Sequence, residues 1–95
     1  MIPAPKFLDW LRENDVSPFP LQKTISGTEH AGGYLYAESN APESLQRARK
    51  KIKNICETLE QQGWDTTIET PSYDMGIHKH RYAFTMRRNL LETQK

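Results

Sequence analysis

The clearest hydrophobic pattern in the chain lies between Asn40 and Gly63 and predicts one long amphipathic helix. Apolar residues recur there at a spacing of three or four, which puts them on a single helical stripe. The stripe comprises Leu45, Ala48, Ile52, Ile55, Cys56 and Leu59. Asn40 suits the N-cap, because its side-chain oxygen can accept from the first free amides. Gly63 suits a left-handed residue that ends the helix and turns Trp64 back onto it.

Alternating apolar and polar positions predict strands at residues 21–26, 33–38, 64–70 and 79–87. The first two flank a glycine-rich stretch, which we interpret as the loop of an antiparallel hairpin. Residues 71–78 are expected to form a connection that contains a turn. In the last strand one face is largely apolar, and we expect it to pack under the long helix. That face carries His80, Tyr82, Phe84 and Met86.

The N-terminal segment, residues 1–20, predicts a short helix followed by an extended strap. Phe7 and Leu11 lie one helical turn apart within residues 3–13, so this helix can dock on the core through them. Two prolines hold the following stretch extended. We expect Phe19, which lies between them, to anchor the strap.

The order of elements predicts a single α+β domain spanning residues 1–95. A short N-terminal helix precedes a β-β-α-β-β unit, in which one long helix packs on a four-stranded, mainly antiparallel sheet. The connection from the second strand through the helix to the third allows the central strands to run parallel. For residues 89–95 two outcomes stay open, a packed helical turn or a frayed tail.

Composition and size narrow the class of protein. The chain has 95 residues, of which 36% are hydrophobic and 26% are charged, and its net charge is +1. This size fits one domain. No apolar run approaches the ~20 residues of a membrane span, and the N-terminus carries no signal-peptide pattern. The lone cysteine, Cys56, falls on the buried stripe, so we expect a structural thiol in a cytoplasmic, reducing environment.

Positive charge is concentrated in two blocks, which provide the main hint of function. The first lies within seven residues of the long helix and comprises Arg47, Arg49, Lys50, Lys51 and Lys53. The second block contains Arg87 and Arg88. Two interpretations stay open, a solvated helix face or a contact surface for phosphate or for an acidic protein. Same-sign charges at this density repel one another, which is the argument for a contact surface.

The connection at residues 72–78 offers a second candidate contact. It carries Tyr73, Met75 and Ile77, and exposed Tyr and Met are typical of protein interfaces. The alternative is that these residues fold over the sheet edge as a lid on the core.

Aromatic residues on the strands raise the question of nucleic-acid stacking. Tyr34, Tyr36, Tyr82 and Phe84 lie on predicted strands, with basic residues interleaved. Such a surface can stack bases. The phase argues against it, because a Tyr82–Phe84 face that packs under the helix cannot also stack bases.

Catalytic and metal chemistry find little support in the sequence. His78 and His80, together with His30, make a metal site conceivable, but their spacing does not demand one. No nucleophile or acid–base pair is selected by its context. We therefore expect no metal, no cofactor, no small-molecule substrate and no enzymatic activity.

These observations favour a small accessory or regulatory protein that acts by binding, such as an inhibitor or modulator. It would dock on a larger protein partner, such as a component of a nucleic-acid-handling complex, through the basic helix face. The second basic block and the loop of Tyr73, Met75 and Ile77 would assist. The alternative is direct DNA or RNA binding by the same face, and no membrane contact is expected.

Overall fold

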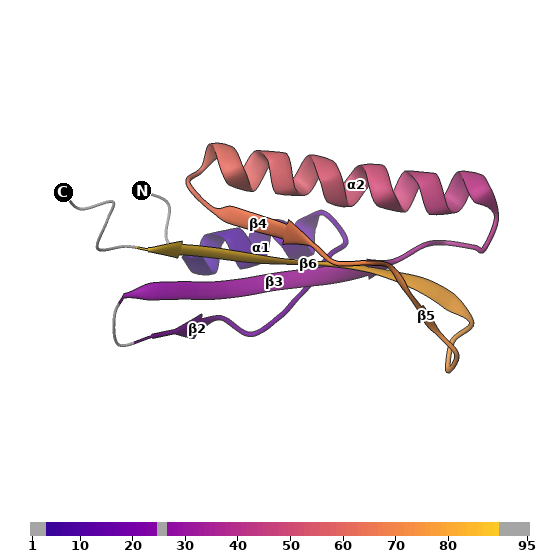
Figure 1. Ribbon diagram of the computed structural model, residues 1–95, viewed down its shortest axis with the longest axis horizontal. Coiled ribbons are helices and arrows are strands. Elements are labelled where there is room, and N and C mark those ends of the chain that lie inside the picture. The colour runs from indigo at the N-terminus through magenta and orange to yellow at the C-terminus, as the bar shows by residue number, and fades with distance from the viewer. Residues whose placement is uncertain (1–3, 25–26, 90–95) are drawn as a thin grey trace.

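The computed structural model describes residues 4–24 and 27–89. The elements in order are α1 (Ala4–Glu13), β1 (Ser17–Pro18), β2 (Gln22–Lys23), β3 (Thr28–Tyr36), α2 (Pro42–Gln61), β4 (Asp65–Ile68), β5 (Ser72–Asp74) and β6 (Lys79–Asn89). Figure 1 shows α2 lying lengthwise over the sheet. The predicted α+β class, with a short first helix and one long helix, is confirmed. In the described part of the chain, neither helix has the length and apolarity needed to span a bilayer.

Two long antiparallel strands, β3 and β6, form the centre of the sheet. The short β1 and β2 both pair with β3, while β4 and β5 both pair with β6. The strand segments therefore fill four strand positions. Every pair is antiparallel, so the parallel arrangement suggested for the central strands is wrong. β3 and β4, which α2 joins, run in the same direction, but β6 lies between them.

The predicted antiparallel hairpin is present, because β2 pairs with β3, but its loop is not the glycine-rich stretch 27–33. Residues 28–33 are part of the long strand β3, and the turn lies earlier, where the Thr24 amide donates to the Thr28 carbonyl over 2.9 Å. Gly32 and Gly33 are there for space, whereas Gly27 has a φ of 88°. A Cβ on Gly33 would lie 2.7 Å from Cγ1 of Val16, because the strap runs close beside β3 and pairs with it through β1. Glycine in a strand marks such a close approach.

The ends of α2 bear out one predicted cap and overturn the other. The N-cap is Ala41, with no side-chain capping bond. Asn40 instead donates to the His78 carbonyl over 3.2 Å and pairs with Nδ1 of His80 at 3.1 Å, which ties the start of α2 to the β5–β6 hairpin. At the other end Gly63 has a φ of 92°, and the Trp64 amide donates to the Leu59 carbonyl over 3.1 Å. This is the Schellman arrangement that the sequence predicted.

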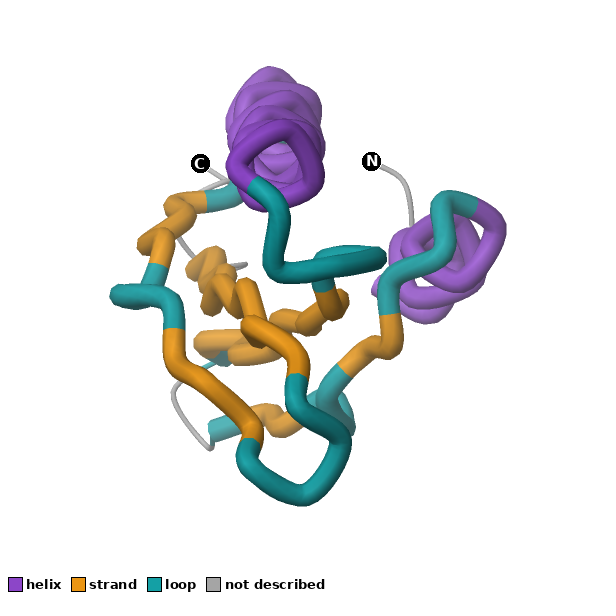
Figure 2. The backbone as a smooth tube through the Cα atoms, turned by 90° about the vertical axis from the view of Figure 1, so that its right-hand side faces the viewer, coloured by secondary structure: helices purple, strands orange, loops and turns teal. Residues whose placement is uncertain are grey.

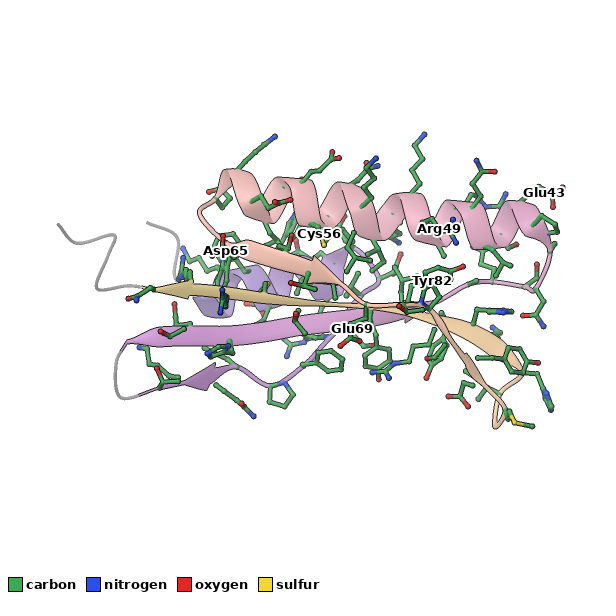
Figure 3. The ribbon with its side chains drawn as sticks, viewed as in Figure 1. Glu43, Arg49, Cys56, Asp65, Glu69 and Tyr82 are labelled. Atoms are coloured by element: carbon green, nitrogen blue, oxygen red, sulfur yellow. The ribbon has the colours of Figure 1, made fainter. Side chains whose placement is uncertain are left out.

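The core lies between the sheet and the two helices. The predicted stripe of α2 is buried from Ala48 to Leu59, while Leu45 at its start is only partly buried. From the other side the core receives Leu35, Tyr82, Phe84 and Met86. Figure 3 shows Cys56 and Tyr82 between α2 and the sheet. The first helix docks through Phe7 and Leu11, as predicted, and the ring of Phe7 meets Trp64 edge-on at 5.6 Å.

The segment expected to be a plain connection forms a hairpin. Residues 72–74 make β5, which pairs with the start of β6 in the register Tyr73↔His80. The predicted turn is present, because the Gly76 amide donates to Oδ1 of Asp74 over 2.9 Å. At the C-terminus, β6 continues to Asn89. The choice between a helical turn and a frayed tail concerns residues 90–95, which lie outside the described residues.

Candidate functional site

The basic cluster of α2 is divided between two flanks of the helix. Arg47, Lys50 and Lys51 line a groove between α1 and α2. Arg49 and Lys53 are exposed and lie outside that groove. This division follows from the helical repeat, because residues two apart point about 200° apart while residues three or four apart share a face. The five cations are close together in the sequence, but only Arg47, Lys50 and Lys51 line a surface that α1 shares.

The α1–α2 groove changes character along its length. Here the name covers the surface lined by Phe7, Trp10, Arg47, Lys50, Lys51 and Thr58. One end is a largely apolar pocket of about 320 Å³, which is lined by Lys6, Phe7, Trp10, Thr58 and Gln62. The middle is a pocket of about 370 Å³ that shares Trp10 and Thr58 with the first and adds the three cations. A side chain of a partner could thus meet an indole at one end of the groove and positive charge at the other.

Two of the groove cations face an acid from a neighbouring loop. Nζ of Lys51 lies 3.7 Å from Oδ2 of Asp15, and Nη2 of Arg47 lies 3.9 Å from Oε2 of Glu38. Both pairs are long and solvent-exposed, so each contributes little to stability. Lys50 makes no ion pair within residues 4–24 and 27–89. Among the described residues, the lining of the groove holds cations and no acid, and the two acids lie beside it.

Arg87 and Arg88 do not join the basic helix face. Arg88 is buried, with Nε 2.7 Å from Oε1 of Glu29, and its guanidinium lies 4.4 Å from the Trp64 ring centroid. Arg87 is exposed on the opposite face of the sheet, in register with His30. Adjacent residues of a strand point to opposite faces, so the two arginines could not have shared one surface. The sequence analysis grouped Arg87 and Arg88 because they are adjacent in the chain, and it did not take this alternation into account.

The β5–β6 hairpin leaves its apolar side chains exposed. Tyr73 is 44%, Met75 77% and Ile77 48% exposed, so they do not close over the core as a lid. The Tyr73 ring packs edge-on against His80 at 5.0 Å, which holds this side chain on the hairpin. Ile68 on β4 is also 48% exposed and extends the apolar edge. The hairpin thus remains a candidate contact, on the β4–β5 side of the sheet.

The sheet face turned away from α2 holds a cluster that the sequence reasoning missed. Tyr82 and Phe84 belong to the core as predicted, but Tyr34 lies on the other face and packs against Phe19 at 5.5 Å. The guanidinium of Arg81 lies 4.6 Å from the Tyr34 ring centroid. Figure 2 shows α2 above the strands and α1 beside them, so this lower face carries no helix among the described residues. Alternation within the predicted strand 33–38 places Tyr34 and Tyr36 on one face. No pattern in the sequence indicated that Phe19 of the strap would join them.

The remaining reactive groups are dispersed or buried. In the described part of the chain, no three side chains of His, Cys, Asp or Glu gather as a metal site. His30 lies near the start of β3, whereas His78 and His80 lie at the far hairpin. Burial raises the pKa of the Cys56 thiol, and a neighbouring Thr66 hydroxyl lowers it in part. Cys56 is thus the structural thiol that its place on the stripe predicted.

Comparisons with protein-family models, with curated proteins and with solved structures find no match for this chain.

Proposed function

We propose that this protein is a non-enzymatic accessory protein that binds a larger protein through the α1–α2 groove. The occupant is a partner segment that carries an apolar anchor at one end and acidic side chains at the other. The single observation that supports this is the gradient along the groove, from Phe7 and Trp10 to Arg47, Lys50 and Lys51. Trp and Arg are also the residue types most enriched at binding hot spots.

The dimensions suit a short segment. From Thr58 to Arg47 the α2 wall of the groove rises about 16 Å, at 1.5 Å per residue. About five residues of extended chain cover that distance, at roughly 3.3 Å each. An apolar side chain at Trp10 would leave carboxylates within reach of Lys50 and Arg47 at the other end. We include among such partners the acidic segments of nucleic-acid-handling complexes.

The acids beside the groove favour a protein over a nucleic acid as the occupant. Asp15 and Glu38 stand next to Lys51 and Arg47 and would face the phosphates of a nucleic acid bound there. A protein segment can instead offer a cationic or amide group to each of them. Direct DNA or RNA binding by the same flank remains the alternative function, and the salt dependence of binding separates the two.

The test is co-purification of the tagged protein from its host after nuclease treatment, with two charge-reversal variants. Arg47→Glu with Lys50→Glu alters the groove, and Arg49→Glu with Lys53→Glu alters the other flank of the same helix by the same charge. We expect a stoichiometric protein partner that the groove variant loses by at least about tenfold, while the control variant retains it. Retention by both variants would refute the groove assignment. Nucleic acid in place of protein, released by moderate salt and lost in the groove variant, would establish the alternative.

A further inference from the structure

The sheet face opposite α2 presents a row of aromatic rings in mutual contact. Phe19 and Tyr34 lie 5.5 Å apart between ring centroids, and Tyr34 and Tyr36 lie 5.8 Å apart. We call these three rings the aromatic row. Each ring is half-buried, so each keeps an accessible part. The planar guanidinium of Arg81 lies over the Tyr34 ring at 4.6 Å and over the Phe19 ring at 5.6 Å, which adds a second surface of the kind on which bases stack.

Charge on this face is sorted strand by strand. The aromatic row belongs to the strap and β3, whose positions on this face carry no acid. The next strand, β6, places Arg81 and Arg87 on the same face. The acids Asp65 and Glu69 come from the next segment beyond β6, and Oδ2 of Asp74 accepts from the Tyr36 hydroxyl over 3.1 Å at one end of the aromatic row. A chain that lies along β3 and β6 therefore meets rings on one side and cations on the other.

An open pocket extends this surface beyond Phe19. It has a volume of about 360 Å³ and lies among Phe19, Gln22, His30, Thr85 and Arg87. This is within the range of pockets that hold small aromatic ligands. Its amide, imidazole, hydroxyl and guanidinium groups can bond to the edge of a base whose face rests on Phe19. Asp65 also lines the pocket and can accept from an exocyclic amine.

We propose that this face binds single-stranded nucleic acid, with bases stacked on the aromatic row and phosphates directed to Arg81 and Arg87. One base would occupy the pocket beside Phe19. The face is separate from the α1–α2 groove, since α2 and the core lie between the two. The protein would thus hold a single strand of nucleic acid and the protein partner proposed above at the same time. Each of the two proposals can fail without the other.

Fluorescence anisotropy with labelled oligo(dT) or oligo(U) of about twelve nucleotides tests this proposal. Tyr34→Leu keeps the bulk of the side chain and removes its aromatic face, and we expect affinity to fall roughly 5- to 100-fold, the value of about one stacked base. Arg12→Gln is the control, because Arg12 is an exposed cation on α1 outside this face, and binding should be unchanged. Should Tyr34→Leu fail to fold, Arg87→Gln at an exposed position serves instead, and the slope of log affinity against log salt should fall by about one.

Three results would overturn the proposal. The first is no binding of the single strand at concentrations up to about 0.1 mM, the weak limit of non-specific binding. The second is equal affinity for a duplex of the same length, because paired bases cannot reach the rings. The third is binding that survives Tyr34→Leu and Arg87→Gln but is lost in Arg47→Glu with Lys50→Glu. That pattern would move nucleic acid to the groove, whereas a failure of the groove proposal alone would appear only in the co-purification.

Discussion

The buried ion pair between Arg88 and Glu29 leads to the sharpest stability prediction. Both side chains are about 5% exposed or less, and the pair joins the two central strands at 2.7 Å. Arg88→Met keeps most of the aliphatic stem but leaves the Glu29 carboxylate buried without its cation. Removing one partner of a buried pair typically costs about 3–5 kcal/mol. That is a large share of the ~5–15 kcal/mol that holds a small domain folded.

Urea unfolding followed by circular dichroism measures this effect. With a denaturant slope of ~1.5 kcal/mol per M, a loss of about 3 kcal/mol lowers the urea midpoint by about 2 M. Arg87→Met is the matched control, because Arg87 is exposed on the other face, and its unfolding free energy should stay within about 0.5 kcal/mol of the wild type.

A double variant tests the physical reason. Replacing Glu29 by Leu together with Arg88 by Met removes both charges, and buried pairs replaced in this way are often neutral or stabilising. We expect the double variant to be more stable than Arg88→Met alone. If Arg88→Met lost less than about 1 kcal/mol, or if the double variant were no more stable than the single one, the reasoning from an uncompensated buried charge would be wrong.

Two further changes probe the strap and the buried thiol. Gly33→Ala should destabilise the fold by about 1–3 kcal/mol, because its Cβ would meet Val16 at 2.7 Å. At Gly63 no atom lies within 4 Å, so Gly63→Ala should lower the free energy of unfolding only by the ~1 kcal/mol that its left-handed backbone costs. Equal losses of the two variants in urea unfolding would contradict the crowding argument. For Cys56, burial raises the pKa of the thiol above its usual 9.0 in the folded state, so the unfolded state releases the proton first and stability falls as pH rises through 9. Cys56→Ala should show a smaller fall between pH 8 and 10 in the same assay, and an unchanged fall would rule out the thiol as a cause.

The sequence by itself determined most of what depends on local periodicity. The stripe of α2, its end at Gly63 and the inward face of β6 were all readable, because each is set by residues within a turn or two of one another. The same reasoning identified Cys56 as structural and the Tyr82–Phe84 face as core. These predictions hold because a continuous apolar stripe is buried whichever element packs against it.

Features that depend on distant residues were decided only in the tertiary structure. The glycine-rich stretch reads locally as a loop, yet the strap that packs on it makes it part of β3. Asn40 suits an N-cap, but the β5–β6 hairpin offers its side chain two other partners.

The candidate sites follow the same rule. Their residues were present in the sequence, but the grouping was not. Packing of α1 divided the cations of α2 into groove and outer flank, and strand alternation sent Arg87 and Arg88 to opposite faces. Only the pairing of the strap with β3 brought Phe19 onto Tyr34. A binding surface is a set of side chains close in space, and periodicity along the chain reports only those on one element.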